Sequence, residues 1–187
     1  MAKKYTQQNI NELRRTDRQK DEIFTREFLK TAPFCSIANA VDGQPFIHSN
    51  IFVYDDKTNQ IYFHTAKEGR FRYNIENNAK VCFTVAEMGR LLPSPTALNM
   101  SMEYKSVVIF GKVTIIEDDA EAESALKILV EKYFPHLKYG VDYSKVTIND
   151  LKRTTVFKLE IERWSGKEKQ VEEDFPGAFD YSISKTN

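Results

Sequence analysis

Apolar residues near the start of the chain follow a helical period. Ile23, Phe24 and Phe28 recur at the spacing of one helix face, in a pattern that begins at Asp21. Pro33 ends this pattern, because proline cannot continue a helix and also restricts the residue before it. We therefore expect a helix between Asp21 and Pro33.

Beyond this helix, short apolar runs bounded by turn residues replace the helical pattern. Such runs are typical of strands. They predict six strands, over residues 34–40, 45–53, 61–65, 81–86, 104–116 and 152–164. The first two strands are expected to form a hairpin through a tight turn at 41–45, because Asp42-Gly43 is a dipeptide that closes hairpins.

Two further helices and one long loop are expected between the strands. Helices are predicted over 68–77 and 120–133, and the acidic residues 117–119 favour the start of the second one. The stretch 87–103 contains two prolines and has no clear period, so we expect a long loop there. Strands that follow one another through short turns predict a mainly β fold with peripheral helices, either an antiparallel barrel or a sandwich.

Length and charge narrow the class of protein. The 187 residues suggest one domain that can bury a sizeable core. The 27 basic and 27 acidic residues give a formal net charge of +0, which argues against a non-specific binder of nucleic acid or of a membrane surface. No apolar run approaches the ~20 residues that span a bilayer, so we expect no membrane segment.

Composition changes at the two ends of the chain. Residues 1–20 are polar, have no apolar segment of the secretory type, and are expected to form a loose arm. Residues 21–167 are expected to form the domain, and residues 168–187 a surface tail. Cys35 and Cys82 lie far apart in apolar runs, which predicts buried, reduced thiols. These features favour a cytoplasmic protein.

The segment 61–74 carries the clearest signal of chemistry. Thr65 and Glu68 match a capping box, which predicts a helix start directly after the strand. A helix start presents free N–H groups and partial positive charge, and Gly69 lets the backbone approach a ligand closely. Further donors or charges there are His64, Thr65, Lys67, Arg70 and Arg72. Together these groups suit a dianionic phosphate.

Other interpretations of this segment stay open on the pattern alone. A capped helix with solvated basic residues fits the same residues. The segment matches neither the Walker loop nor the dinucleotide glycine fingerprint, so ATP or NAD sites of those folds are not expected. His48 and His64 lack a third histidine, cysteine or carboxylate at ligand spacing, so no metal site is expected.

The strand 45–53 has two chemically different faces. With a period of two, one face carries Ile47, Ser49, Ile51 and Val53, and we expect it in the core. The other face carries Phe46, His48, Asn50 and Phe52. This second face mixes aromatic and polar groups and suits a flat heterocycle with hydrogen-bonding carbonyls. A solvated face or a subunit interface would show the same pattern.

Several motifs together resemble one protein family. They are DGQP (42–45), YFHTAKEGRFR (62–72), VCF (81–83) with EMGRLLP (87–93), EYKSVVIFG (103–111), KYFP (132–135) and WSGK (164–167). Through them the chain resembles the pyridoxamine 5'-phosphate oxidase-like flavoproteins, in particular the branch related to nitroimidazole-resistance flavoproteins. The resemblance covers about residues 15–167 and implies a six-stranded antiparallel split β-barrel that binds FMN between the subunits of a homodimer.

The resemblance also implies which residues hold FMN. Its phosphate would lie against His64, Thr65, Ala66, Gly69, Arg70 and Arg72, with Phe63 and Lys67 beside them. Its isoalloxazine ring would lie along His48, Ser49 and Asn50. Tyr104, Ser106, Trp164 and Lys167 would lie near the subunit interface. Many relatives carry lysine where this chain has Phe71, so the phosphate charge would come from Arg70 and Arg72.

The function that the resemblance implies is an FMN-dependent oxidoreductase or reductase of a small planar substrate, with NADH or NADPH as a candidate electron donor. His48 is the side chain expected to meet the substrate, and the stretch 87–103 is a candidate lid over the ring. The alternatives are a non-enzymatic flavin-binding, storage or sensor module, and a pyridoxamine 5'-phosphate oxidase. A deazaflavin or haem could replace FMN in the same barrel. The fold alone does not fix the reaction.

Overall fold

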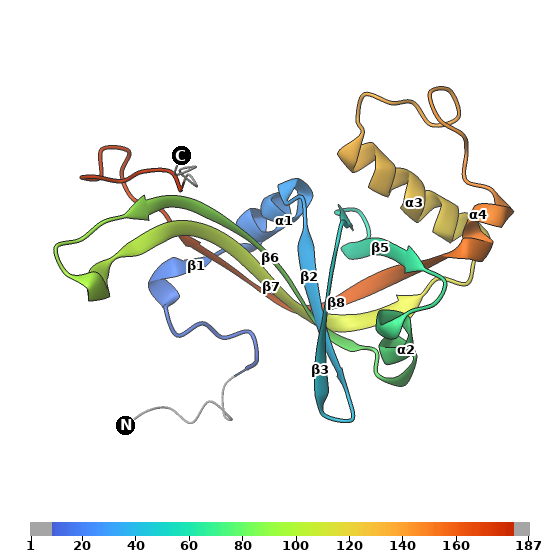
Figure 1. Cartoon of the computed structure of the whole chain (residues 1–187), viewed down its shortest axis with the longest axis horizontal. Coiled ribbons are helices and arrows are strands. Elements are labelled where there is room, and N and C mark those ends of the chain that lie inside the picture. The colour runs from blue at the N-terminus through green and yellow to red at the C-terminus, as the bar shows by residue number, and fades with distance from the viewer. Residues whose placement is uncertain (1–8, 182–187) are drawn as a thin grey trace, which may run out of the picture.

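The chain folds around one antiparallel β-sheet of eight strands (Figure 1). The computed structural model describes residues 9–181. The strands are β1 (Gln19–Lys20), β2 (Cys35–Val41), β3 (Gln44–Asn50), β4 (Val53–Asp55), β5 (Gln60–Ala66), β6 (Lys80–Leu92), β7 (Ser101–Ile115) and β8 (Thr154–Lys169). They pair in the order β3-β2-β6-β7-β8-β5-β4, and β1 adds to β8. Because β3 and β4 do not pair with each other in the described residues, the sheet forms an open, split barrel.

All six expected strands are present. The described sheet has two more strands than expected, and each addition has a local cause. The strand expected at 45–53 is divided into β3 and β4, because the chain leaves the ladder after Asn50. The Asn50 amide accepts a hydrogen bond from the Ile51 N–H at 2.9 Å and donates one to the His64 carbonyl at 2.6 Å. This side chain ties the end of β3 to β5. The other addition, β1, has only two residues, too few to show a period.

The helices surround the sheet, so the predicted mainly β fold with peripheral helices is confirmed (Figure 1). They are η2 (Thr16–Arg18), α1 (Glu22–Thr31), α2 (Arg70–Asn77), η3 (Ala97–Asn99), α3 (Asp119–Tyr133) and α4 (Ile148–Arg153). Two of them have the start that the sequence predicts: the Asp21 carboxylate accepts from the Phe24 N–H at 2.9 Å, and Asp118 from the Glu121 N–H at 2.8 Å. The short helix α4 was not expected.

Two clusters of buried apolar residues lie on the two faces of β5 and β8. The first lies inside the curved sheet, against α1 and α2, and includes Phe63, Phe71, Phe83, Ile109 and Phe157. The second lies between the sheet and α3 and includes Val53, Tyr62, Ala125, Leu129 and Val156. In the first cluster the rings of Phe63 and Phe157 stack with centroids 5.3 Å apart. Packing on both faces holds β5 in place, and with it the turn that follows β5.

The prediction of a long loop at 87–103 is wrong. β6 continues to Leu92 and β7 begins at Ser101, with a register shift between Met88 and Leu91. These strand ends leave the core, so both of their faces are partly exposed and the alternation that marks a strand is lost. We call residues 86–92, 101–106 and 163–169 the ribbon. It projects away from α3 and α4 (Figure 1).

Both ends of the described chain lie along the ribbon. β1 pairs with β8 at Lys167 and Gly166, and Phe179 forms a two-way backbone bridge with Leu91. The predicted arm 1–20 and tail 168–187 lie partly outside the described residues, at 1–8 and 182–187. None of the described helices has the length and apolar character needed to cross a membrane.

Candidate functional site

The capping box predicted for Thr65 and Glu68 does not form in the turn between β5 and α2, so this prediction is wrong. Gly69, with a φ of +152°, occupies the N-cap position of α2. The Thr65 hydroxyl instead donates to the Ala66 carbonyl at 2.8 Å. No side chain among residues 9–181 caps this helix start. The backbone N–H groups of the first turn are therefore available to a ligand.

Arg72 is held by its own chain. Its guanidinium donates to the Glu76 carboxylate at 2.8 Å, to the Thr155 hydroxyl at 2.9 Å and to the Lys67 carbonyl at 3.1 Å. These bonds fasten the turn to β8. The guanidinium is thus already satisfied, which makes Arg72 a support of the turn rather than a free cation.

Arg70 and Lys67 differ from Arg72. Within the described chain, neither side chain pairs with a carboxylate, and both residues are exposed. The Arg70 guanidinium lies 5.7 Å from the centroid of the Tyr73 ring. Its charge is therefore available to an anion that approaches the start of α2.

Two hollows flank Tyr73 at this turn. The first, about 400 Å³, lies between α2 and the β2–β3 hairpin and is lined by Val41, Asp42, Gln44, Pro45, Phe46, Arg70, Tyr73 and Asn74. The second, about 390 Å³, follows the turn itself and is lined by Lys67, Glu68, Gly69, Arg72, Tyr73 and Glu76. The turn thus has concave surface on both sides, and a ligand larger than a phosphate ion can reach it.

His64 and Thr65 point to opposite faces of β5, because successive side chains alternate along a strand. His64 pairs with Val156, on the face covered by α3, and its Nδ1 is buried without a partner among the described residues. Burial lowers the pKa of His64, so the ring is predominantly neutral at pH 7. Thr65 pairs with Thr155, the residue that Arg72 contacts. The structure therefore brings Thr65, but not the His64 ring, to the side where Arg72 lies.

The faces of β3 alternate as predicted, but within this strand their assignment is reversed. Of the residues expected in the core, Val53 in β4 is buried and Ile51 packs against the second buried cluster, as predicted. Ile47 is 65% exposed and Ser49 is exposed, so the expectation that they face the core is wrong. The inner face is instead the one against which α2 packs, where the His48 ring stacks on Phe71 with centroids 4.8 Å apart. Burial lowers the pKa of His48, and its Nε2 has no partner in the part of the chain that the structure describes.

β3 is also an edge strand. It pairs only with β2 in the described sheet, so its other edge offers backbone N–H and C=O groups. The exposed Ile47 and Ser49 lie on its outer face, and the Ser49 hydroxyl shares a hydrogen bond of 3.1 Å with Ser36. A flat ligand on this face would meet backbone and Ser49. The side chains of His48 and Asn50 point inward.

The four residues expected at a subunit interface lie on β7 and β8, toward the end of β8 that is far from Thr155. Tyr104, Ser106 and Lys167 share one face of the ribbon, with Ser106 directly opposite Lys167. Trp164 faces the other way, and the Arg26 guanidinium lies 5.2 Å from its ring centroid. Along β8, Lys167 is roughly 40 Å from the partner of Thr65, at about 3.3 Å per residue. One copy alone therefore does not bring this set to the turn after β5.

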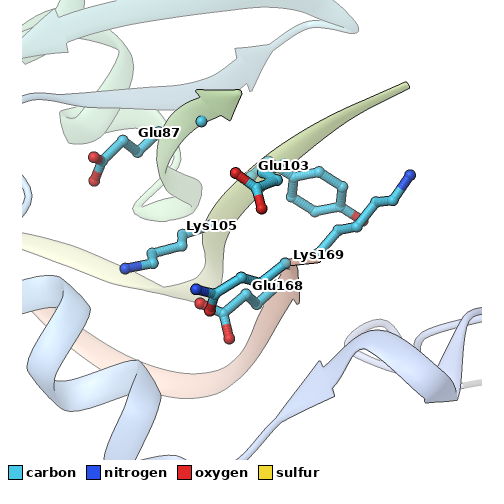
Figure 2. A pocket seen from close by; sticks show the side chains of 8 residues that line it. Glu87, Glu103, Lys105, Glu168 and Lys169 are labelled. Atoms are coloured by element: carbon cyan, nitrogen blue, oxygen red, sulfur yellow. The ribbon is translucent and has the colours of Figure 1, made fainter. Parts of the chain in front are cut away.

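Charged residues that the sequence patterns missed lie on the ribbon and on η2, which precedes β1. Arg18 donates to the Tyr104 hydroxyl at 3.2 Å, and Lys169 lies opposite Tyr104 in the ladder. A hollow of about 200 Å³ beside them is lined by Glu87, Gly89, Glu103, Tyr104, Lys105, Glu168, Lys169 and Gln170 (Figure 2). The basic run RRTDRQK (14–20) was a signal, but only the fold places it against β7 and β8.

The two cysteines are reduced and lie apart from each other. Cys35 is buried and Cys82 half-buried, and both thiols are free. Burial raises the pKa of the Cys35 thiol to about 12, so it is protonated at neutral pH. Across residues 9–181, no group of three histidine, cysteine or acidic side chains gathers to hold a metal ion.

Comparisons with known proteins agree with this architecture. Residues 21–168 match the family model described as pyridoxamine 5'-phosphate oxidase. A search of curated protein sequences gives no match.

Three solved structures resemble the chain. The flavocytochrome Anf3 from Azotobacter vinelandii has a TM-score of 0.73 at 20% identity, covering 92% of this chain and 84% of that one. The FAD and haem binding protein from Mycobacterium smegmatis has a TM-score of 0.74 at 20% identity, covering 82% and 74%. A protein from Bacteroides thetaiotaomicron VPI-5482, whose description links it to 5-nitroimidazole antibiotic resistance, has a TM-score of 0.66 at 22% identity, covering 80% and 84%. At these identities the likeness establishes the fold.

Proposed function

The chain belongs to the pyridoxamine 5'-phosphate oxidase family, and on this premise we propose that it is a flavoprotein that holds FMN between two copies of itself and acts as an oxidoreductase of a small planar substrate. The observation that carries the proposal is the turn after β5, where an uncapped helix start and the unpaired Arg70 lie next to an edge strand. Two structures of the same fold support a flavin, since one is a flavocytochrome and the other binds FAD and haem.

The phosphate of FMN fits this turn. A dianion needs positive charge and several donors, which Arg70, Lys67 and the first N–H groups of α2 offer together. Nothing lies within 4 Å of the place where a Cβ on Gly69 would stand, so the approach is open. Phe71 points into the core, which leaves Arg70 as the main cation. Arg72 keeps the turn in position.

The isoalloxazine ring would lie on the outer face of β3. Its pyrimidine edge carries carbonyl and N–H groups, and the free edge of β3 supplies backbone partners for both. The exposed Ile47 offers apolar contact to the flat ring. In this arrangement residues 48–50 bind through backbone and the Ser49 side chain, while His48 supports the strand from inside.

A second copy would complete the site. Lys167, and Tyr104 and Ser106 of β7 that pair with the same end of β8, lie too far from the turn of their own chain to meet a flavin bound there. On the same face of the ribbon, Met88 is 45% exposed and Met102 is 40% exposed. Exposed apolar surface of this kind is typical of an interface. We therefore propose that the ribbon of one copy covers the flavin of the other.

Bound FMN would supply the electron chemistry, and the chain would bind and orient both the cofactor and the substrate. His48 and His64 are predominantly neutral at pH 7, because burial lowers the pKa of each. Neither ring therefore adds charge beside the flavin. The free thiols Cys35 and Cys82 favour the reducing cytoplasm as its location.

The cofactor and the assembly can be tested on the purified protein. It should be yellow and should release FMN on denaturation, identified by chromatography and distinguished by its spectrum from a deazaflavin or haem. Light scattering should give twice the 21.7 kDa mass of the chain. A colourless protein that does not take up added FMN would contradict the proposal.

The reaction class needs a separate measurement. Rapid reduction of the flavin by NADH or NADPH in a stopped-flow experiment is the result expected of an oxidoreductase. A flavin that stays oxidised with both donors would point to a storage or sensor module. Efficient turnover of pyridoxamine 5'-phosphate would identify the oxidase instead.

A further inference from the structure

One hydrogen bond connects β3 with β5, two strands that do not pair in the described sheet. β3 pairs with β2, while β5 pairs with β8 and β4. The Asn50 side chain, at the end of β3, donates from Nδ2 to the His64 carbonyl of β5 at 2.6 Å. Across residues 9–181 this is the hydrogen bond that joins the two strands. A side-chain amide therefore stands where the open sheet has no ladder.

The Asn50 amide is held in one orientation. Its Oδ1 accepts from the Ile51 N–H at 2.9 Å, so its Nδ2 is directed toward the His64 carbonyl. The backbone of Asn50 pairs with Cys35 of β2, and the Cys35 thiol donates to the Asn50 carbonyl at 3.2 Å. Because both the backbone and the amide are fixed, the connection to β5 is stiff.

The part of β5 that Asn50 reaches has a ladder on one side only. β4 pairs with β5 as far as Tyr62, and residues 63–66 of β5 pair with β8 alone in the described sheet. The turn with Gly69 and Arg70 follows directly after these residues. The position of this turn relative to β3 therefore depends on contacts that come from β3 itself or from α2.

The contacts through α2 hold the two strands together without fixing their spacing. The Phe71 ring lies 4.8 Å from the His48 ring of β3 and 5.7 Å from the Phe63 ring of β5, measured between centroids. Apolar packing of this kind is not directional, so it tolerates small shifts. A hydrogen bond is lost when its distance or angle changes. The bond from Asn50 is thus the contact that sets the distance.

The proposed function puts the two parts of the cofactor on these two strands. The ring would lie on the outer face of β3, beside Ser49, and the phosphate at the turn after β5. One covalent chain joins ring and phosphate, so both bind at once only when their subsites are the right distance apart. Asn50 follows Ser49 directly and lies between the two subsites. Its side chain is uncharged and points inward, away from the ring.

We propose that Asn50 is a positioning residue that sets the distance between the ring and phosphate subsites and so makes the site specific for a phosphorylated flavin. This inference rests on the proposed function and adds the residue that gives FMN its advantage over riboflavin. Asn50 acts through the His64 peptide, which it holds at a fixed distance from β3. Its loss should reduce the contribution of the phosphate and leave ring binding unchanged.

Titration of the full-length protein, freed of flavin, with FMN and with riboflavin tests the proposal. Riboflavin has the same ring and sugar chain but lacks the phosphate. Asn50→Ala should weaken FMN binding about tenfold, because subsites at a variable distance lose the advantage of linked binding. Riboflavin binding should change by less than about twofold, since its ring subsite does not depend on the turn. A merely structural role would weaken both flavins alike.

Asn78→Ala is the matched control. The Asn78 amide makes the same two kinds of bond: it donates to the Ala40 carbonyl at 2.9 Å and accepts from the Lys80 N–H at 3.2 Å. Asn50 and Asn78 are both half-buried, but Asn78 ties the end of α2 to β2 and does not connect β3 with β5. Asn78→Ala should therefore change the ratio of the two affinities by less than about twofold.

Thermal unfolding and circular dichroism check that each variant is folded. If Asn50→Ala does not fold, Asn50→Ser takes its place, because the shorter side chain does not reach the His64 carbonyl. Three results would overturn the proposal: the Asn50 variant leaves both affinities unchanged, it weakens FMN and riboflavin equally, or it narrows their ratio no more than Asn78→Ala does.

Failure of the proposed function gives a different result, because it appears in the wild-type protein. A wild type that binds FMN no more tightly than riboflavin would contradict the phosphate site at the turn, and one that binds neither would contradict the flavin site. Each of these results removes the present inference as well. A wild type that prefers FMN, with a variant at Asn50 that keeps the preference, overturns only the role of Asn50.

Discussion

The two ends of β8 differ in how the positive charges of nearby side chains are paired. Near Thr155, where β8 pairs with β5, the Arg72 guanidinium is satisfied by a carboxylate, a hydroxyl and a carbonyl of its own chain. Near Lys169, in the ribbon, Arg18 and Lys167 lie beside the Tyr104 ring. Here the Asp17 carboxylate is shared between Arg15 and Arg18. The first arrangement holds a turn in place, whereas the second leaves several cations close together at the surface.

Packing explains why the two ends can differ. At the β5 end, β8 lies between two apolar clusters, so an unpaired charge there would weaken the fold. The ribbon end contributes little to either cluster and can keep charges that repel one another. The comparison predicts that stability depends on the barrel, while binding depends on exposed residues at both ends.

The largest effect should come from the aromatic core at the barrel end. Phe157 is fully buried and contacts Phe63 and Phe71, with centroids 5.3 and 5.4 Å away. Phe157→Ala should lower the free energy of unfolding by about 3–5 kcal/mol, because it leaves a cavity. Urea unfolding followed by circular dichroism measures the change.

A leucine in the connection at the tip of the ribbon provides the control. Leu98 is 95% exposed in η3, so Leu98→Ala should change the free energy of unfolding by less than about 0.5 kcal/mol. A loss comparable to that of Phe157→Ala would show that the ribbon is part of the stabilising core, and the contrast between the two ends would fail.

The next effect separates two arginines of one turn. Arg70→Gln should weaken FMN binding by about 1.5–3 kcal/mol, the value of a charge-assisted hydrogen bond, with little change in thermal stability. Arg72→Gln should mainly affect stability. It removes the bonds that hold the turn and so lowers the melting temperature, and it should weaken FMN binding only because the turn is less well held. Flavin titration and thermal unfolding of both variants provide the comparison.

The opposite pattern would exchange the two roles. If Arg72→Gln lost more FMN affinity than Arg70→Gln at unchanged stability, the bonds of Arg72 to Glu76 and Thr155 would have to give way when the cofactor binds. The phosphate would then lie on the β8 side of the turn.

The sequence predicts most of the fold because the relevant signals are local. Asp21 and Asp118 cap the helices that the apolar period predicts. Asp42 and Gly43 adopt positive φ values of 52° and 78°, as the hairpin turn requires. Each of these features depends on neighbours within a few residues, so a pattern in the chain is sufficient to reveal it.

The predictions from sequence fail where contacts between distant segments determine the structure. The faces of β3 are reversed because α2 covers the side that looked more polar, and period alone does not say which side a helix will cover. The capping box fails because Gly69 starts the helix. The ribbon looked like a loop because strands outside a core lose their alternation. Arg18, Tyr104 and Lys169 lie far apart in the chain, and no local pattern brings them together.

A smaller effect concerns Lys132, a half-buried lysine of α3 at the barrel end. The Lys132 ammonium donates to the Ala32 carbonyl at 2.7 Å and lies 3.8 Å from the Phe52 ring centroid. Burial lowers its pKa to about 8. The unfolded chain keeps the proton above pH 8 while the folded chain loses it, so the free energy of unfolding should rise with pH. After allowance for solvent screening, we expect about 1–2 kcal/mol in total.

Urea unfolding of the wild-type protein and of a Lys132→Met variant between pH 7 and pH 9 measures this slope. Cys35, whose ordinary pKa is 9.0 and is raised by burial, lowers the free energy of unfolding toward pH 9, but it does so in both proteins, so the difference between them isolates Lys132. Lys132→Met should flatten it, whatever the variant does to stability at neutral pH. A slope that is equally steep in the variant would assign the effect to another group.

The smallest effect is expected in the ribbon and at acidic pH. The hydrogen bond from Arg90, followed by that from the Val171 N–H, lowers the pKa of Glu103 to about 2. A carboxyl with a lowered pKa stabilises the fold above its ordinary value of 4.5, and this contribution is lost as pH falls toward 2. Because Glu103 is exposed to solvent screening, we expect local release of the segment after β8 rather than global unfolding.

Amide hydrogen exchange measures that release. Glu103→Gln should speed exchange at Val171, whose N–H donates to Glu103 at 3.0 Å, and leave exchange in β5 unchanged. Glu168→Gln, which breaks the pair with Lys20 on the same ribbon, should not affect Val171. If Glu103→Gln also sped exchange in β5, the two ends of β8 would unfold as one unit, and the ribbon could not carry its charges independently of the core.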